Sequence, residues 1–215
     1  MNQLLGNEVK DQIKEFLKGM KDRVTFVLFT KKGTCETCNE TRMLLKEVSE
    51  LNSLISFKEK DLEENHDEAR FYNINLVPSF VILDKNENYR GVKFNGIPAG
   101  HEINSFLTAT LDMSGLDFEI DEDSRKRIKN IDKKVNIKVF VTLSCPHCPG
   151  AVSKAHRLAM LNDNIDAEMI EAQTFYDFSR KYNVSGVPKI VINETHELVG
   201  NQPIEAFLNQ LENLN

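Results

Sequence analysis

Apolar and polar positions along the chain follow helical and strand periodicities in a regular order. Residues 24–30 form a short apolar run rich in β-branched and aromatic side chains, which predicts a buried strand. Further strands are expected over residues 55–60, 79–83 and 89–94, and helices over 63–73 and 100–111. Before the first strand, apolar residues of 4–20 recur at helical spacing: Leu5, Val9, Ile13, Phe16, Leu17 and Met20.

The same order of elements returns in the second half of the chain. The expected elements are a strand over 135–143, a helix over 146–162, a strand over 166–170, a helix over 173–182, a hairpin over 189–199 and a helix over 203–213. Strands that alternate with helices predict an α/β fold, with a mixed central sheet flanked by helices in each unit. We therefore expect two units, residues 1–115 and 116–215, with the acidic residues 117–123 as their connection.

An internal sequence repeat supports this division. Residues 71–83 align without a gap with residues 181–193, and Tyr, Asn, Val, Pro, Val and Ile coincide at a spacing of 110. Further along, residues 103–107 resemble residues 204–208 at a spacing of 101. The second unit is therefore nine residues shorter, and we expect the shortening in its hairpin loop.

The four cysteines form two C-x-x-C pairs at the repeat spacing, Cys35 with Cys38 and Cys145 with Cys148. Each pair follows a predicted strand and opens a predicted helix. Unsatisfied N–H groups and the helix dipole at a helix N-terminus favour a thiolate, and a second cysteine three positions on can expel a bound product. This pattern predicts thiol–disulfide exchange, with Cys35 and Cys145 as nucleophiles and Cys38 and Cys148 as resolving thiols.

A Val-Pro pair lies at the same distance from each cysteine pair. Pro78 follows Cys35 by 43 residues, and Pro188 follows Cys145 by 43 residues. Proline alone can simply open an edge strand, but the repeated distance predicts cis peptide bonds that turn Val77 and Val187 toward the cysteines. The backbone groups of these valines would then pair with an extended substrate strand.

Four cysteines could instead hold a structural zinc ion. Zinc sites usually bring their pairs together within a few tens of residues, whereas here Cys38 and Cys145 lie in separate complete units. We therefore expect no metal site, although a non-enzymatic module that binds peptides or metal through the same residues remains the alternative class. Loss of insulin-reductase activity on Cys→Ser substitution would reject that alternative.

The chain resembles the thioredoxin superfamily in tandem, and specifically the glutaredoxin-like protein disulfide oxidoreductases of archaea and thermophilic bacteria. This resemblance implies two thioredoxin-fold units, each with a redox disulfide, that oxidise, reduce or isomerise protein disulfides. It also implies electron supply from a thioredoxin-reductase-like flavoprotein. The residues that carry it are the two Val-Pro pairs, Cys35-Glu36-Thr37-Cys38, Cys145-Pro146-His147-Cys148-Pro149, Ala151-Val152 and Ala155.

The chain departs from thioredoxins proper in its motif, because it has no Trp-Cys-Gly-Pro-Cys, and at the position of a buried acid. They usually carry a buried acid six residues before the first cysteine, where this chain has Phe29 and Val139. A second resemblance is to the N-terminal tandem module of the alkyl hydroperoxide reductase flavoprotein, which implies an electron carrier to a peroxidase. That module typically keeps one C-x-x-C, whereas this chain has two.

The residues between the cysteines predict that the thiolate is more stable at one site than at the other. His147 can stabilise the Cys145 thiolate by charge or hydrogen bonding, although an exposed polar residue at a helix start is the alternative interpretation. Glu36 places a negative charge beside Cys35, which disfavours a thiolate there. We therefore expect a lower thiol pKa at Cys145. The remaining histidines have no matching partners and are expected at the surface: His66, His101, His156 and His196.

Composition narrows the class of partner. The 215 residues carry a formal net charge of −6, which does not favour nucleic acid, and no apolar run is long enough to span a membrane. The first eight residues lack the features of a secretory signal, so we expect a cytoplasmic protein. No phosphate-binding Gly-rich loop is present, and we expect no bound cofactor. Protein disulfides and dithiols are the substrates that the resemblance to the disulfide oxidoreductases implies.

Overall fold

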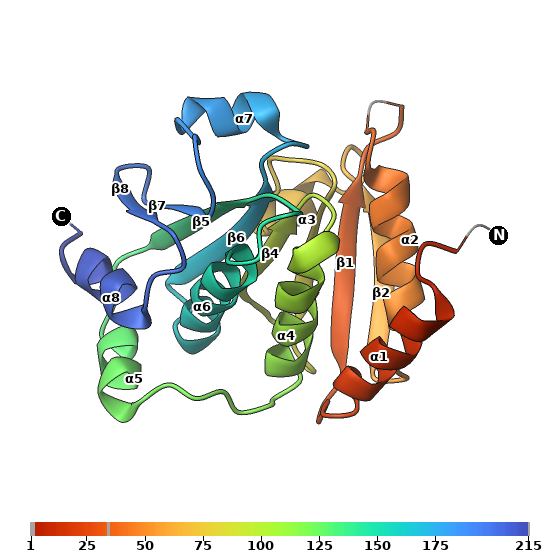
Figure 1. Ribbon diagram of the computed structural model, residues 1–215, viewed down its shortest axis with the longest axis horizontal. Helices are drawn as coiled ribbons and strands as arrows, with labels where there is room; N and C mark the ends of the chain where they lie inside the picture. The colour runs from red at the N-terminus through yellow and green to blue at the C-terminus, as the bar shows by residue number, and fades with distance from the viewer. Residues whose placement is uncertain (1–2, 34, 215) are drawn as a thin grey trace.

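The computed structural model describes residues 3–33 and 35–214, in which eight strands form one mixed sheet. The strands are β1 (Val24–Thr30), β2 (Ile55–Asp61), β3 (Ser79–Leu83), β4 (Tyr89–Asn95), β5 (Val135–Val141), β6 (Ile165–Glu171), β7 (Lys189–Ile192) and β8 (His196–Val199). Their order across the sheet is β2-β1-β3-β4-β6-β5-β7-β8 (Figure 1). Each half thus contributes four adjacent strands, which confirms the predicted α/β class.

Helices cover both faces of this sheet. They are α1 (Asn7–Leu17), α2 (Cys38–Ser49), α3 (His66–Phe71), the 3₁₀ turn η1 (Gly100–Glu102), α4 (Ile103–Met113), α5 (Glu122–Lys129), α6 (Cys148–Leu161), α7 (Tyr176–Lys181) and α8 (Ile204–Glu212). One large apolar cluster under α1, α2, α4, α6 and α8 contains residues of both halves. Two smaller clusters lie under α3 and α7. None of the described helices is long and apolar enough to cross a membrane.

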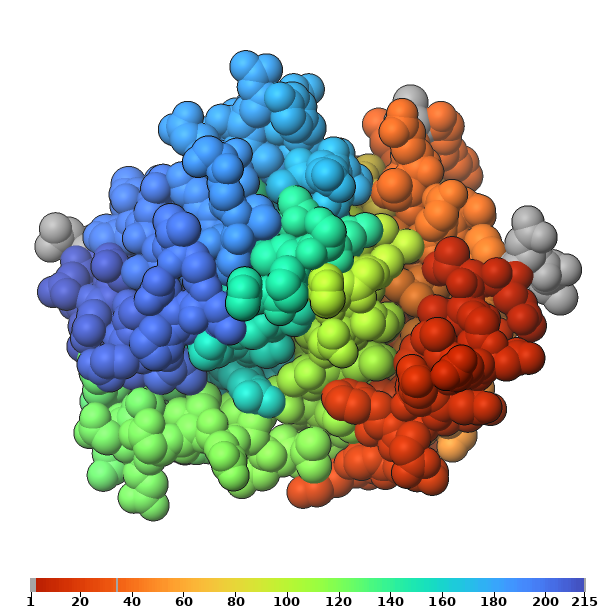
Figure 2. Space-filling view, in the orientation of Figure 1, coloured from red at the N-terminus to blue at the C-terminus, as the bar shows by residue number. Residues whose placement is uncertain are grey.

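The two halves are joined through both the sheet and the helices. Residues 92–95 of β4 pair in parallel with residues 167–170 of β6. Helix α4 packs against α6 on the face above this strand pair (Figure 1). Figure 2 shows the two halves meeting along this line over the front of the molecule. The expectation that the units pack through their sheets or helices is confirmed.

Buried polar contacts add specificity to this junction. Lys93 on β4 is 1% exposed, and its ammonium lies 3.5 Å from the Glu168 carboxylate on β6. The Asn95 side chain donates to the same carboxylate at 2.9 Å. Above the sheet, Arg157 of α6 pairs with Asp112 of α4 at 2.7 Å. Because removing one partner would leave a buried charge unpaired, these contacts oppose separation of the halves.

The connection between the halves contains a helix that the sequence pattern did not predict. Residues 117–121 are extended or irregular, and α5 follows from Glu122. The Asp121 carboxylate accepts the Ser124 backbone N–H at 2.9 Å, which caps the helix. Ile128 is its one fully buried apolar side chain, so α5 lacks the apolar periodicity that marks the other helices.

The hairpin loop accounts for only part of the nine residues by which the second half is shorter, so that expectation is correct only in part. The difference is spread over three places: the hairpin turn is shorter, β8 has four residues where β4 has seven, and residues 200–203 replace the longer connection 96–102. The longer connection of the first half contains η1, which contacts the loop before Cys145 and packs against α6.

A glycine at the junction requires the absence of a side chain. Gly91 has φ +73°, and an added Cβ would lie 2.3 Å from the Ile165 carbonyl oxygen and 2.9 Å from Ala159 Cβ. We expect Gly91→Ala to lower the free energy of unfolding by about 2 kcal/mol, because backbone strain and overpacking act together. Gly6→Ala, where nothing lies within 4 Å, should change it by less than about 0.5 kcal/mol. Urea unfolding measures both, and equal effects would contradict the prediction.

Candidate functional site

The second cysteine pair lies where β5 leads into α6. Cys145 and Cys148 form a disulfide with their Cα atoms 5.5 Å apart. Helix α6 begins at Cys148 rather than at residue 146, so Cys145 precedes the helix and His147 is its N-cap residue. Cys148 is fully buried, whereas Cys145 retains 9% exposure. The more exposed residue of the pair is therefore the predicted nucleophile, in front of the helix N-terminus.

The first cysteine pair has the same geometry, but the loop between its strand and its first cysteine is longer. Cys35 and Cys38 form a disulfide with a Cα separation of 5.4 Å, and α2 begins at Cys38. Cys35 is half-buried and Cys38 is buried. Strand β1 ends at Thr30, five residues before Cys35, whereas β5 ends four residues before Cys145. The halves therefore differ by one residue in the loop that leads to the reactive sulfur.

Both Val-Pro peptide bonds are cis, as the sequence predicted. Val77 and Val187 are half-buried, whereas the prolines are buried. Val187 packs against the core cluster that contains Cys145 and Cys148, while Val77 packs against a cluster of the first half without cysteines. Among the hydrogen bonds of residues 3–33 and 35–214, none uses the backbone N–H or C=O of either valine. These groups can therefore pair with another chain.

The connection from β4 to α4 contacts the loop that carries Cys145. The His101 backbone N–H donates to the Leu143 carbonyl at 2.9 Å, two residues before that cysteine. Gly100 has φ +57°, and a Cβ there would lie 2.4 Å from the same carbonyl oxygen. Glycine is thus needed for this close approach. The first half of the chain in this way supplies part of the surroundings of the second cysteine pair.

Glu102 is a buried acid on this connection that the sequence pattern did not predict. Its side chain is fully buried, and the Ser105 hydroxyl donates to its Oε2, while Oε1 has no partner among the described residues. Burial raises the pKa of Glu102 to about 7, although the bond from Ser105 lowers it. Thioredoxins proper usually hold a buried acid on the strand before the motif. Here η1, which packs against α6, supplies one.

The histidines divide into one buried and four more accessible residues. His147 is exposed and beside Cys145, and His66 and His101 are also exposed, as expected. The expectation of a surface position for His156 is wrong, because that side chain is 1% exposed and its ring packs at a tilt against Phe94, with ring centroids 4.7 Å apart. Its Nε2 lies 3.1 Å from the Lys93 carbonyl, and burial lowers the pKa of His156 to about 4. His156 is therefore neutral at pH 7 and belongs to the junction of the halves.

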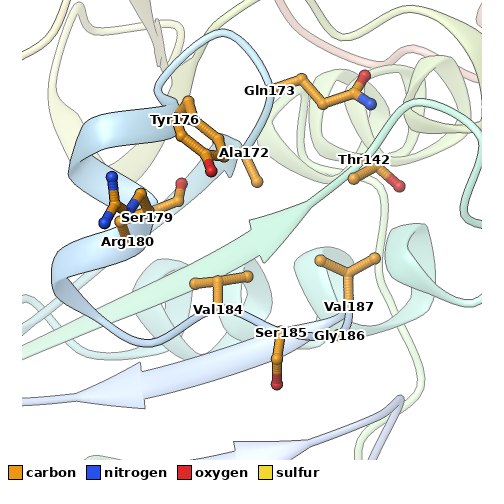
Figure 3. A pocket seen from close by; sticks show the side chains of 10 residues that line it. All are labelled: Thr142, Ala172, Gln173, Tyr176, Ser179, Arg180, Val184, Ser185, Gly186 and Val187. Carbon is orange, nitrogen blue, oxygen red and sulfur yellow. The ribbon is translucent and has the colours of Figure 1, made fainter.

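The remaining features of the site concern metal binding and a small cavity. Within 3–33 and 35–214, no three or more His, Cys, Asp or Glu side chains are arranged to hold a metal ion. A small cavity lies between Val187 and Thr142, and it is lined by α7 on its far side (Figure 3). Sequence reasoning did not predict this cavity.

Comparison with known proteins agrees with this geometry. Residues 135–213 match the family described as Thioredoxin domain. A protein disulfide oxidoreductase from Aeropyrum pernix has a TM-score of 0.89 and 28% identity, over 96% of this chain and 92% of that one. The chain is a thioredoxin-fold protein. This thioredoxin-fold chain is thiol–disulfide oxidoreductase-like, and both of its C-x-x-C pairs form disulfides.

The alkyl hydroperoxide reductases are equally similar. A solved alkyl hydroperoxide reductase structure from Enterococcus faecalis has a TM-score of 0.91 and 27% identity, over 97% of this chain and 100% of that chain. An alkyl hydroperoxide reductase protein of Staphylococcus aureus (strain Mu50) is 30% identical over 208 residues. That alignment covers 97% of this thioredoxin-fold chain but only 38% of the relative.

Proposed function

We propose that this protein is a thiol–disulfide oxidoreductase that acts on protein disulfides through both cysteine pairs. The observation that carries the proposal is the repeated combination of a C-x-x-C disulfide before a helix and a cis Val-Pro bond before a strand. Residues 1–115 and 116–215 are then two units with one redox site each. The similarity to the Aeropyrum protein disulfide oxidoreductase over nearly the whole chain supports this function.

The proposed reduction proceeds in two balanced exchanges. The Cys145 thiolate attacks one sulfur of a substrate disulfide, and the other substrate sulfur leaves as a thiolate. The Cys148 thiolate then attacks Cys145 Sγ, the mixed disulfide breaks, and the first substrate sulfur leaves. The substrate gains two electrons and, after protonation, two protons, while the chain gains the Cys145–Cys148 disulfide. The reverse sequence oxidises a substrate dithiol, and Cys35 with Cys38 would react in the same way.

We propose that Glu102, which lies on η1 where this turn packs against α6, accepts the Cys148 proton before the second exchange. The Cys148 thiol is buried and must lose its proton before it can attack. A carboxyl group whose pKa is about 7 is poised to accept a proton near neutral pH and to release it again. Val187, with its unpaired backbone groups beside Pro188, would align the substrate strand, and Val77 with Pro78 would do so at the first site.

Regeneration of the dithiols needs an electron donor, for which we propose a thioredoxin-reductase-like flavoprotein. A cytoplasmic location suits this role because the cytoplasm keeps such dithiols reduced. The similarity to the alkyl hydroperoxide reductases favours a second candidate function, in which the chain carries electrons to a peroxidase. Preferential reduction of a peroxidase disulfide, in competition with insulin, would distinguish this role from general disulfide reduction.

The proposed function is tested by insulin reduction with dithiothreitol as the reductant. We expect the protein to accelerate reduction, and the double variant Cys35→Ser/Cys145→Ser to match the rate of dithiothreitol alone. Circular dichroism establishes that the variant is folded. Undiminished activity in that variant, or the absence of acceleration by the unaltered protein, would reject the proposal.

A further inference from the structure

A cavity of about 250 Å³ adjoins the second redox site. Figure 3 shows Val184 and Val187 directing their side chains into it from the loop before β7, with α7 opposite. Thr142 closes the cavity beside the loop that leads to Cys145, and the Cys145 N–H donates to the Thr142 carbonyl at 3.1 Å. The volume is below that of most small-molecule sites, so it suits one side chain of a bound polypeptide.

Two polar side chains line this cavity without a hydrogen-bond or ion-pair partner among the described residues. Ser179 is 4% exposed, and its hydroxyl is buried without a hydrogen bond. Arg180 is exposed at the rim of the cavity; its guanidinium lies over the Tyr176 ring at 5.9 Å, and it makes no ion pair within residues 3–33 and 35–214. No acidic side chain lines the cavity in this part of the chain. A buried hydroxyl donor and a free guanidinium together match a carboxylate.

The first half provides an internal reference, because α3 and α7 occupy repeat-related places. Ala69 stands where α7 has Ser179, so the buried hydroxyl is replaced by a methyl group. Leu76 stands where the second half has Gly186, and Leu76 packs against a core cluster of the second half. An arginine is present in both halves, as Arg70 and Arg180. The hydroxyl and the side-chain-free position are therefore particular to the second site.

We propose that this cavity binds a glutamate side chain of the substrate protein near its reactive cysteine. The inference rests on the proposed function and names a preference of the Cys145 site. A substrate strand paired with Val187 places alternate side chains on one face, about 3.3 Å of rise per residue, so we place this glutamate two positions from the substrate cysteine. The glutamate methylenes contact Val184 and Val187, and its carboxylate accepts from Arg180. The Ser179 hydroxyl is buried in the unbound chain and becomes a second donor when its side chain turns toward the cavity.

The test uses two short peptides with one internal disulfide, which differ only by Glu or Gln two positions from a cysteine. The full chain carries Cys35→Ser and Cys38→Ser, which isolates the second site. At low ionic strength we expect kcat/KM for the Glu peptide to exceed that for the Gln peptide about fivefold, because a charge-assisted contact forms. Arg180→Gln should bring this ratio to about one. Ser179→Ala introduces the alanine that the first half has at the repeat-related position, and it should lower the Glu/Gln ratio of kcat/KM.

Arg70→Gln is the matched control, since it removes the repeat-related arginine of the first half, and it should leave the ratio unchanged. Equal kcat/KM for the two peptides, or a preference that survives Arg180→Gln, would overturn the inference. Fluorescence anisotropy with the same peptides, their cysteines replaced by serine, measures binding without reaction. Tighter binding of the Glu peptide supports the proposal that the cavity binds glutamate, even if neither peptide is reduced. Binding without reduction would reject only the proposed function. Equal binding overturns the inference.

Discussion

Cys145→Ser is expected to remove at least about four fifths of the insulin reduction catalysed by the chain, whereas Cys35→Ser should retain most of it. Both first cysteines precede a helix N-terminus, so the neighbouring charges distinguish them. Exposed Glu36 beside Cys35 disfavours a thiolate, and His147 beside Cys145 supports one. We therefore expect the Cys145 thiol to have the lower pKa. Because a lower pKa also weakens the nucleophile, the gain in rate is smaller than the gain in thiolate.

Exposure acts in the opposite direction, since Cys35 is more accessible than Cys145. Iodoacetamide alkylation against pH separates the two effects: the midpoint reports ionisation, and the plateau at high pH reports access. Measured on reduced Cys145→Ser and Cys35→Ser, with Cys38 and Cys148 also replaced by serine, it gives one titration per site. A Cys35→Ser variant without activity beside a fully active Cys145→Ser variant would reverse the ranking.

The stability of the chain should decrease as pH rises through the titration of Glu102. Burial raises the pKa of Glu102 from 4.5 to about 7, so the folded state holds a proton that the unfolded state has already lost. The stability contribution of this group is complete below about pH 4.5 and is lost as pH rises to about 7. Glu102→Gln keeps a neutral side chain throughout. The free energy of unfolding of Glu102→Gln, minus that of the unaltered protein, should rise by about 3 kcal/mol between pH 4.5 and pH 8.

Urea unfolding of the oxidised protein at several pH values measures this difference. Taking the difference between Glu102→Gln and the unaltered chain cancels other titrations, including that of His156, which favours stability at higher pH. Glu119→Gln, at an exposed glutamate, is the control and should show no such trend. A constant difference between Glu102→Gln and the unaltered chain across this range would contradict the burial argument.

Local signals in the sequence were sufficient for the strands, the cysteine pairs and the cis prolines. Each of these depends on short-range chemistry that occurs twice, so the repeat separated it from coincidence. The apolar pattern did not predict helix α5, because its eight residues bury a single large apolar side chain, Ile128. Its Asp121 cap was the available signal, since Asp before a helix commonly accepts the N–H three residues on.

Glu102 and His156 could not be placed because their burial arises from contact between the halves. Glu102 is one of 33 acidic residues, and nothing in its neighbours marks it as buried. It is buried where η1 meets the loop and helix of the other half. His156 did carry a signal, since it follows Cys148 and Val152 at four-residue spacing on the buried face of α6. Its assignment to the surface gave too little weight to that periodicity.

The parallel β4–β6 pairing makes one continuous sheet of what the repeat presents as two units. A hinge motion between the halves would have to break the hydrogen bonds between β4 and β6. It would also separate the buried Lys93–Glu168 ion pair. The two disulfides are therefore held at a constant distance and orientation, unlike sites on domains tethered by a linker. Electrons cannot pass between them by one site swinging onto the other. A substrate bound at one site therefore meets the other site in a single fixed relative placement.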